Sequence, residues 1–379
     1  MAMRNNTSQS LSEAKAAKKD EWYTQMEDIS AEMRYHRKQF KDATVLCNCD
    51  DPYESNFFKY FALNFNRLKL KKLIATCYKG SPVVATQLSW FPEYEASYEL
   101  NTYVNKKAYK IEITEVPDIN GDGAIDITDV EELLKSNNNI LTELEGDGDF
   151  RSPECLALLD EATIVSTNPP FSLWIPYMQL LIEKQKKFLI LGNLTGIGYK
   201  EIFPHIKANK LWLGQSIHSG DREFRVPDDY PLNAASSRID EYGNKYIRVK
   251  GVRWYTNLDT PGRHERLDMY KKYTPEEYPS YYNYDGINVS KTSEIPKDYY
   301  GNMGVPLSFM DVYNPDQFEI IGIGSGNLGK SIGVGNILRE HKQKMRGHSA
   351  AGDLYYLLPD GTPKVPFARM IIKRKDRDE

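Results

Sequence analysis

The sequence predicts an α/β fold built on a parallel β-sheet with helices on both faces, followed by a loop-rich C-terminal region. Short apolar segments rich in β-branched residues alternate with amphipathic helical segments through the first two thirds of the chain. Parallel neighbours require such a crossover between them, so the alternation favours a parallel sheet. From about residue 260 the alternation ends, and Tyr, Asn, Pro and Gly become frequent.

The first expected elements lie between residues 30 and 78. Apolar and aromatic residues from Phe57 to Leu68 recur every three or four positions, which is typical of a helix face. The turn residues Asp50, Asp51 and Pro52 separate this helix from the strand before it. The predicted elements are a helix over Ser30–Phe40 with Ser30 as N-cap, a strand over Ala43–Cys49, a helix over Glu54–Leu68 and a strand over Lys72–Tyr78.

Residues 79–142 interrupt the pattern, and the alternation resumes after them. The elements predicted there are strands over Ala162–Thr167, Phe188–Asn193 and Lys210–Leu213 and helices over Ser172–Lys187 and Tyr199–Ala208, with later short strands over Gln317–Ile323 and Ala368–Lys373. We therefore expect a flexible tail over residues 1–19, a main domain over residues 20–260 and a smaller region over residues 261–379.

Composition excludes several classes of protein. Of 379 residues, 40% are hydrophobic and 27% are charged, so the chain can form a large core and is not disordered overall. Four cysteines are too few for a disulfide scaffold, and no second Cys/His cluster completes a zinc site with Cys47 and Cys49. No apolar run is long enough to span a membrane, and residues 1–19 lack the apolar segment of a secretory signal. We expect a cytoplasmic protein.

The net charge of −4 conceals an uneven distribution. Between Glu112 and Glu161 there are 15 acidic residues against two basic ones, so the rest of the chain is basic. A surface that faces nucleic acid is therefore compatible with the overall charge.

The most informative motif is Asn168-Pro169-Pro170-Phe171, at the end of one predicted strand and before a helix. Ligands of open α/β sheets bind at that edge. The exocyclic amine of a nucleobase is a poor nucleophile, because its lone pair is delocalised into the ring. The Asn168 side-chain oxygen and the Pro169 carbonyl can accept its two hydrogens, which stabilises the positive charge that develops on nitrogen. Phe171 offers a flat face to a base taken out of the stack. The alternative is a plain Pro-Pro turn.

This motif is similar to the catalytic motif of methyltransferases that act on the amino group of DNA adenine. Other stretches resemble the EcoRI-type adenine-specific DNA methyltransferases, the EcoRI modification methylase family, and the likeness covers nearly the whole chain. These stretches are Asp20–Gln25 (DEWYTQ), Val45–Phe61 (VLCNCDDPYESNFFKYF), Gly146–Glu154 (GDGDFRSPE), Ser280–Thr292 (SYYNYDGINVSKT), Gly304–Pro306 and the basic segment Ala368–Lys375.

The resemblance implies a Rossmann-like sheet that binds S-adenosyl-L-methionine over residues 20–260, with an acidic insert at about 112–145, and a DNA target-recognition region over residues 261–379. Tyr23 and Thr24 match the segment that folds over the methionine end of the cofactor. Asn48, Asp50 and Asp51 stand where relatives of this fold have a glycine-rich loop. Asp149 and Phe150 match an acid and an aromatic residue beside the adenine ring. For Asp149, an Asx turn that closes the Gly146–Gly148 loop is the alternative.

Two further motifs point to other chemistry. The segment from Asp118 to Asp129 has the spacing of a calcium-binding loop, which predicts a structural Ca²⁺ site or, alternatively, a solvated acidic loop. Its oxygen ligands would be Asp118, Asn120, Asp122, Asp126 and Asp129. The segment Gly324–Ser331 matches the spacing of a phosphate-binding loop, but no acidic strand end for Mg²⁺ follows it, so a hairpin tip or a loop near DNA phosphates is favoured.

The sequence thus predicts a monomeric enzyme that methylates N6 of a flipped adenine in double-stranded DNA, alongside a restriction endonuclease that acts separately. The resemblance also implies a palindromic target similar to GAATTC. Two alternatives stay open. One is a nucleic-acid-binding protein with an inactive methyltransferase core, because the cofactor loop lacks glycines. The other is methylation of an amide nitrogen in protein, which motifs of this type also perform.

Overall fold

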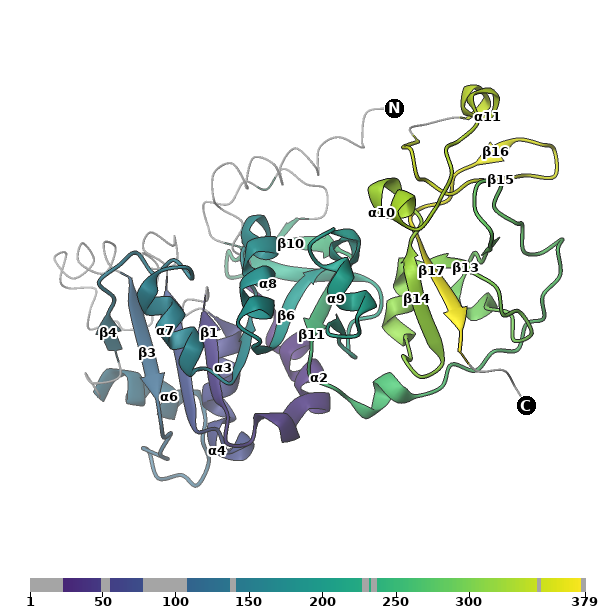
Figure 1. Ribbon diagram of the computed structural model, residues 1–379. Coiled ribbons are helices and arrows are strands. Elements are labelled where there is room, and N and C mark those ends of the chain that lie inside the picture. Colours follow the sequence, from purple (N-terminus) through teal and green to yellow (C-terminus); the bar gives the residue numbers. More distant parts are fainter. Residues whose placement is uncertain are drawn as a thin grey trace. The chain divides into compact units, whose positions relative to one another are not determined.

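The computed structural model describes residues 23–48, 55–77, 108–136, 141–226, 232, 237–345 and 349–375 (Figure 1). The chain forms two compact units. The first comprises Met1–Asn193 and Ser219–Leu258, and the second comprises Leu194–His218 and Asp259–Glu379. The segment Leu194–His218, expected in the domain over residues 20–260, thus groups with the C-terminal part of the chain.

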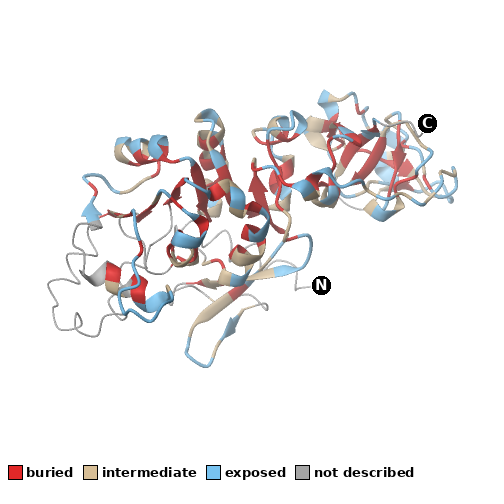
Figure 2. Ribbon diagram, turned by 90° about the horizontal axis from the view of Figure 1, so that it is seen from below, coloured by how far each residue is buried: buried red, intermediate tan, exposed pale blue. Residues whose placement is uncertain are grey.

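The first unit is built on a mixed β-sheet with the strand order β4-β3-β2-β1-β5-β6-β11. Its strands are β1 (Thr44–Asn48), β2 (Lys72–Cys77), β3 (Tyr109–Ile113), β4 (Leu141–Glu143), β5 (Ile164–Thr167), β6 (Lys187–Asn193) and β11 (Val252–Thr256). The four central strands β2, β1, β5 and β6 are parallel, as the alternation predicts. Every residue of β1 and β5 is buried, as expected for strands covered on both faces (Figure 2).

Helices lie on both faces of this sheet, and two aromatic contacts on β11 show it. Trp254 packs edge-on against Phe57 of α3 with ring centroids 5.8 Å apart, whereas Tyr255 packs against Trp174 of α8 at 4.8 Å. Successive residues of a strand point to opposite faces, so α3 and α8 cover opposite sides. The helices of this unit are α2 (Met26–His36), η1 (Arg37–Phe40), α3 (Asn56–Leu63), α4 (Phe65–Leu68), α6 (Ile127–Ser136), α7 (Pro153–Glu161), η5 (Phe171–Leu173) and α8 (Trp174–Glu183).

Every predicted helix differs in extent from the helix observed. α8 ends at Glu183 instead of Lys187, and α9 spans only Phe203–Lys207 instead of Tyr199–Ala208. The first helix begins at Met26, so Ser30 is not its N-cap. The helix expected over residues 54–68 is two helices that meet at Asn64. Ser55 caps the first of them, because its hydroxyl accepts hydrogen bonds from the backbone N–H groups of Phe57 and Phe58.

The region in which the alternation breaks adds antiparallel strands to the sheet edge. β3 pairs antiparallel with β2, and β4 pairs antiparallel with β3. At the other end, β11 pairs antiparallel with β6. A separate antiparallel ribbon has the order β8-β10-β9, from β8 (Asp221–Val226), β10 (Lys245–Lys250) and β9 (Arg238–Ile239). The sheet is therefore parallel only at its centre.

The second unit has short strands joined by long loops. Its main sheet has the order β12-β13-β17-β14, and β15 pairs with β16 in a hairpin. The strands are β7 (Trp212–Leu213), β12 (Ile287–Asn288), β13 (Met303–Pro306), β14 (Phe318–Ile323), β15 (Tyr356–Leu357), β16 (Pro363–Lys364) and β17 (Arg369–Arg374). The helices are η6 (Leu194–Gly198), α9 (Phe203–Lys207), η7 (Pro261–His264), η8 (Thr292–Glu294), η9 (Leu307–Val312), α10 (Gly326–Ser331) and α11 (Arg339–Lys344). β14 and β17 lie within one residue of the strands predicted there.

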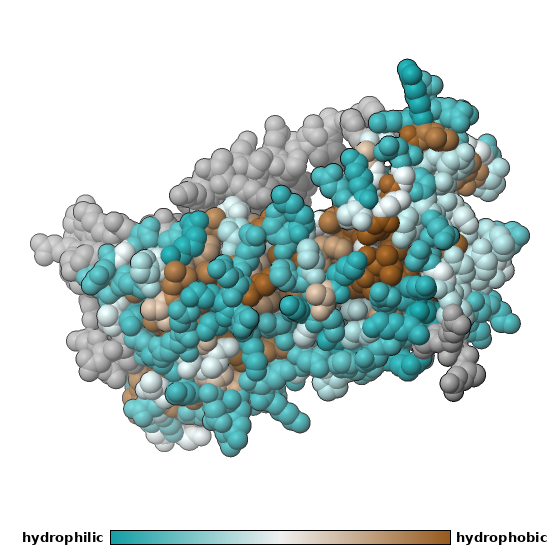
Figure 3. Space-filling view, viewed as in Figure 1, coloured by the Kyte–Doolittle hydropathy of each residue, from teal (hydrophilic) through white to brown (hydrophobic). Residues whose placement is uncertain are grey.

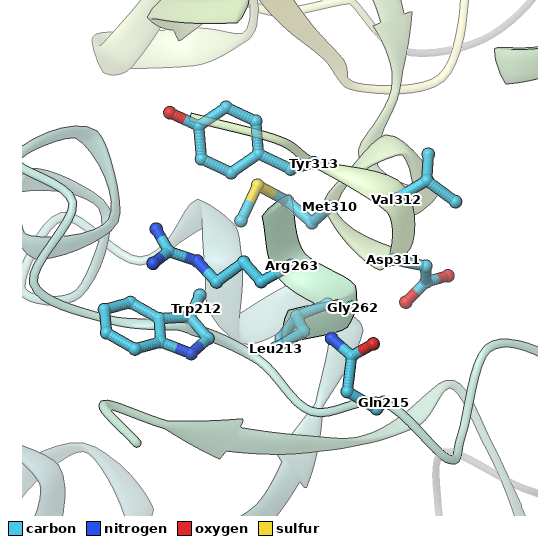
Figure 4. Close-up of a pocket in the computed structure, with 9 residues that line it drawn as sticks. All are labelled: Trp212, Leu213, Gln215, Gly262, Arg263, Met310, Asp311, Val312 and Tyr313. Atoms are coloured by element: carbon cyan, nitrogen blue, oxygen red, sulfur yellow. The ribbon is translucent and has the colours of Figure 1, made fainter. Parts of the chain in front are cut away.

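A buried arginine joins the two chain segments of this second unit. Arg263 is 6% exposed, and its guanidinium lies 3.7 Å from the centre of the Trp212 ring (Figure 4). The same guanidinium donates hydrogen bonds to Asn209 and to Asp259. Burial lowers the pKa of Arg263, and the Asp259 carboxylate opposes that shift. Arg263 therefore lines the pocket between Trp212 and Tyr313, and its hydrogen-bond partners Asn209 and Asp259 belong to the same unit.

Polar side chains cover most of the face seen in Figure 3, and hydrophobic residues gather there in a few areas. Among the residues that the structure describes, no helix has both the length and the apolar composition needed to cross a membrane.

We expect His264 to make the stability of the second unit depend on pH. Its ring nitrogens lie 2.9 Å from an Asp316 oxygen and 3.0 Å from an Asp259 oxygen, and hydrogen bonds to these carboxylates raise the pKa of His264. Because the folded pKa is raised, the charged pair stabilises the fold below the unfolded pKa of about 6.5, and this contribution is lost as pH rises through the folded pKa.

The measurement compares the free energy of unfolding of the parent and of His264→Gln at acidic and alkaline pH. Because His264 is 41% exposed, solvent screening limits the acidic difference to about 0.2–1 kcal/mol, and it should shrink at high pH. A difference that grows with pH would contradict the assignment.

Candidate active site

The sheet order reverses between β1 and β5. β1 has β2 on one side and β5 on the other, and all three run parallel. The carboxyl ends of β1 and β5 therefore meet at one edge, which is the place where open α/β sheets bind ligands. β1 ends at Asn48 and β5 at Thr167, whose hydroxyl donates a hydrogen bond to the Asn48 carbonyl. The structure thus places Asn48 beside the start of the motif at residues 168–171.

The motif combines one buried amide with a half-exposed ring. Asn168 is 7% exposed, and Pro169 is buried. Pro170 is extended, with φ −52° and ψ 131°, and its carbonyl accepts a hydrogen bond of 2.9 Å from the N–H of Leu173. Phe171, at the start of η5, is half-buried. This conformation holds an amide at the strand end and leaves part of an aromatic face accessible beside it.

Tyr177 connects two predicted site residues, Asn48 and Phe150, and sequence reasoning missed it. It is fully buried on α8, and its hydroxyl donates a hydrogen bond to the side-chain oxygen of Asn48. Its ring packs edge-on against Phe150, with centroids 5.1 Å apart. Tyr177 lies on the apolar face of α8 with Trp174, Met178 and Leu181. The only signal in the sequence is a hydroxyl on that face, because a buried hydroxyl needs a partner.

Thr24 supplies a polar group that the protein leaves unsatisfied. It is 3% exposed, and its hydroxyl has no hydrogen-bond partner among the described residues. The carbonyl of Thr24 accepts a hydrogen bond of 2.7 Å from Asn56, the first residue of α3, and Tyr23 bridges to Arg225 of β8. A buried hydroxyl without a partner is costly, so its persistence here is consistent with a ligand that binds it.

Asp149 forms a local turn, but this is not the turn over Gly146–Gly148 that is the alternative to a cofactor contact. Its carboxylate accepts hydrogen bonds from the backbone N–H of Arg151 at 2.8 Å and from the Arg151 guanidinium at 2.6 Å. This turn ends at Arg151. Gly148 lies in a separate turn, in which the Asp147 carboxylate accepts a hydrogen bond from the N–H of Asp149. Phe150 is 4% exposed and points into the core against Tyr177. Asp50 and Asp51 lie outside the described residues.

The comparison with protein families decides what this site belongs to. The family model described as adenine-specific methyltransferase EcoRI matches residues 10–375. The chain belongs to this family. It is therefore an adenine-specific methyltransferase, as the motif and the resemblance predict.

Three curated relatives of this methyltransferase are type II methyltransferases. M.EcoRI of Escherichia coli is 43% identical over 338 residues, which cover 87% of this chain and 94% of the relative. M.MpnI of Mycoplasma pneumoniae is 37% identical over 312 residues, which cover 81% and 83% of the two chains. M.MgeORF184P of Mycoplasma genitalium is 35% identical over 312 residues, covering 81% and 84%. No solved structure is significantly similar to the chain.

The acidic loop of the methyltransferase uses its carboxylates to bind its own backbone. Asp118 accepts hydrogen bonds from the N–H groups of Gly121 and Gly123, and the buried Asp129 accepts from Asp126, Ile119 and Asn120. These bonds, that from Asp126 foremost, lower the pKa of Asp129. The side-chain oxygens of Asn120, Asp122 and Asp126 form Asx turns. Each accepts a hydrogen bond from the backbone N–H two residues later, at Asp122, Ala124 and Thr128 respectively.

This arrangement gives the predicted calcium site no support. Within the described part of the chain, no group of three or more His, Cys, Asp and Glu side chains is placed to hold a metal ion. The side-chain oxygens of residues 118–129 instead accept hydrogen bonds from backbone N–H groups of their own loop.

The glycine-rich segment at residues 324–331 is likewise closed by a protein carboxylate. Asp353 accepts a hydrogen bond of 2.9 Å from the N–H of Gly326, at the start of α10, and one of 2.8 Å from the hydroxyl of Ser325. A carboxylate therefore holds the position at this helix start that a phosphate would need. The spacing reflects a turn against residue 353 and not a nucleotide-binding loop.

We expect Tyr177→Phe to weaken cofactor binding and to lower stability. The change removes the donor to the buried side-chain oxygen of Asn48 and should cost about 1–3 kcal/mol in free energy of unfolding. It should also weaken binding of S-adenosylmethionine, measured by calorimetry, because Asn48 loses its orientation at the end of β1.

Tyr255→Phe is the matched control. Tyr255 is also fully buried, and its hydroxyl donates to the Asn193 carbonyl at 2.7 Å, at the end of β6. It should lose comparable stability and keep the parent's cofactor affinity. Equal loss of cofactor affinity in both variants would show that Tyr177 acts only through global stability.

Proposed function

We propose that the chain transfers a methyl group from S-adenosyl-L-methionine to N6 of an adenine that is turned out of double-stranded DNA. The observation that carries this proposal is the position of the Asn168–Phe171 motif at the carboxyl end of β5, beside the end of β1. A nucleobase inside a duplex cannot reach such a recessed site, so the target base leaves the stack.

Asn168 and Pro169 act on the amine as hydrogen-bond acceptors. The amide oxygen of Asn168 accepts one N–H, and the carbonyl of Pro169 accepts the other, so the nitrogen lone pair is directed away from the ring. Because Asn168 is held at 7% exposure, its dipole acts in a water-poor environment, where it stabilises the positive charge that develops on nitrogen. After transfer, the surplus proton of the methylated amine leaves to solvent.

Phe171 holds the flipped base. Its half-buried ring follows Asn168 by three residues in the motif, and a base stacked on it would present its amino edge to the two acceptors. The Pro-Pro sequence fixes the backbone between the amide and the ring, because proline locks φ. The motif thus positions the base in addition to binding its hydrogens.

The cofactor site is assigned to residues around the ends of β1 and α3. When bound, S-adenosylmethionine supplies a methyl group on a positively charged sulfur. The unpartnered hydroxyl of Thr24 fits a polar group at its methionine end, with Tyr23 beside it. Phe150 and Asn48, linked by Tyr177, fit the nucleoside end. Asp50, Asp51 and Asp149 complete this assignment from the sequence, and the Asp149 carboxylate also accepts a hydrogen bond from Arg151.

We further propose that residues 261–379 recognise the DNA target, and that the enzyme acts as a monomer in a restriction–modification pair with a separate endonuclease. The family assignment and the type II relatives support this role.

Asn168→Ala tests the catalytic assignment. Loss of one of two acceptors should lower turnover about 10²–10³-fold and leave the affinities for cofactor and DNA near those of the parent, because the interaction is stronger in the transition state than in the ground state. The assay uses radiolabelled cofactor with DNA, RNA and protein as acceptors, and label in RNA or protein alone would refute the DNA assignment.

Asn193→Ala is the matched control for Asn168→Ala. Asn193 ends the neighbouring strand β6 and donates a hydrogen bond of 2.8 Å to the Lys250 carbonyl. It should keep turnover within a few-fold of the parent. Full activity of Asn168→Ala would show that the motif is only a turn.

Phe171→Ala should separate base extrusion from DNA binding. Loss of the stacking surface should reduce the population of extruded base by roughly 5- to 150-fold, the equivalent of about 1–3 kcal/mol, while DNA affinity changes little. Fluorescence of 2-aminopurine at the target position reports extrusion. A signal equal to that of the parent would contradict the stacking role of Phe171, whereas Phe171→Tyr should retain the signal.

A further inference from the structure

The C-terminal part of the second unit carries an aromatic side chain that the fold holds in solvent. Phe367 is 91% exposed. It lies in the short loop between β16 (Pro363–Lys364) and β17 (Arg369–Arg374). Burial of a phenylalanine side chain is favourable, so a partner that covers this ring would be stabilised by the contact.

Both ends of this loop are anchored, so the exposure is a property of the fold. Pro363 is buried, and β17 lies inside the sheet between β13 and β14, with Met370, Ile371 and Ile372 fully buried. Arg369 donates a hydrogen bond of 3.2 Å to the buried Asn288. Pro366 restricts the backbone directly before the ring. Phe367 is thus presented on a braced backbone.

The surroundings of the ring are basic. Residues 326–375 contain ten Lys and Arg against three Asp and Glu. Of the three acids, Asp353 is bound by Gly326 and Ser325, Asp360 accepts the N–H of Thr362, and Glu340 is exposed in the first turn of α11. Lys364 is exposed three residues before Phe367, so the ring stands in a field of positive charge.

Helix α11 (Arg339–Lys344) extends this basic surface. It lies against β16, and its Arg339, Lys342 and Lys344 are exposed. An aromatic cluster ties it to the β15–β16 hairpin: His341 packs against Tyr282 at 4.8 Å and hydrogen-bonds the hydroxyl of Tyr355 at 3.1 Å. Helix α11 with its exposed cations and the β15–β16 hairpin with Lys364 therefore form one surface, called the basic platform below.

We propose that Phe367 is an aromatic wedge that inserts at a base step of the DNA substrate, with Lys364 and the basic residues of α11 on the phosphates beside it. A partner for this surface must combine regularly spaced negative charge with flat apolar faces, and duplex DNA provides both. A symmetric contact between two copies of the chain would place this basic surface against itself, and like charges disfavour that contact.

The test measures binding of the full chain to a fluorescently labelled duplex that it methylates, over a range of salt concentrations. Phe367→Ala should weaken binding roughly 5- to 150-fold with an unchanged slope of log Kd against log salt, because a stacked ring releases no counterions. Lys364→Ala should instead reduce the magnitude of that slope by about 0.9, as expected for one lost phosphate contact.

Two further variants complete the experiment. Phe367→Trp should bind within a few-fold of the parent, and its added fluorescence should be quenched on DNA by contact with bases. Tyr242→Ala is the matched control, because Tyr242 is 82% exposed but follows Asp240 and Glu241, and its DNA affinity should equal the parent's. Unchanged affinity of Phe367→Ala, or an effect confined to self-association, would overturn the proposal.

The proposed role of Phe367 rests on the proposed function, in which DNA is the substrate. The two proposals can fail separately, and different measurements distinguish them. Phe367→Ala should keep the methyl-transfer rate at saturating DNA within a few-fold of the parent while the KM for DNA rises. Asn168→Ala should do the opposite, with turnover lost and DNA affinity retained.

Discussion

The parallel pairing of β1 with both β2 and β5 is the constraint on which the site depends. Every residue of β1 is buried, and a shift of register by one position would turn its side chains to the other face. The register sets Leu46 beside Val165 and thereby brings Asn48 next to Thr167. All the proposed chemistry lies at this one edge, because two buried strands of different chain segments end there together.

The sequence predicts the centre of this architecture well and its edges poorly. Buried parallel strands and their crossover helices have a strong apolar pattern, so β1, β2, β5, β6 and the motif at residues 168–171 could be located. β3 instead alternates buried and half-buried residues, and it pairs antiparallel with β2 and β4, a direction that no local pattern in the sequence encodes. The role of Tyr177 could not be predicted for a related reason. Its partner Asn48 is 129 residues away, and no local pattern in the sequence indicates a hydrogen bond over that separation.

Two segments have the spacing of ligand-binding loops, but in the structure protein groups form the hydrogen bonds that a ligand would take. The oxygens of Asp118 and Asp129 bind backbone N–H groups of their own loop, and Asp353 occupies the start of α10. Loops that bind metals or phosphates and loops that close on themselves need the same residues, because both rely on short polar side chains and glycines with positive φ. Gly121 and Gly123 have φ of 75° and 89°, as either case requires. Spacing alone cannot separate the two.

The net charge of the chain is a poor guide to its partner because its charges are segregated. The acidic excess lies between Glu112 and Glu161 in the first unit, and the basic excess lies at residues 326–375 in the second. At physiological salt, electrostatic interactions at the surface are screened beyond about 8 Å, so a polyanion responds to the local charge of a surface and not to the sum over the chain. Duplex DNA is therefore repelled by the acidic insert of the first unit and attracted by the basic platform around Phe367 in the second, before any base is read.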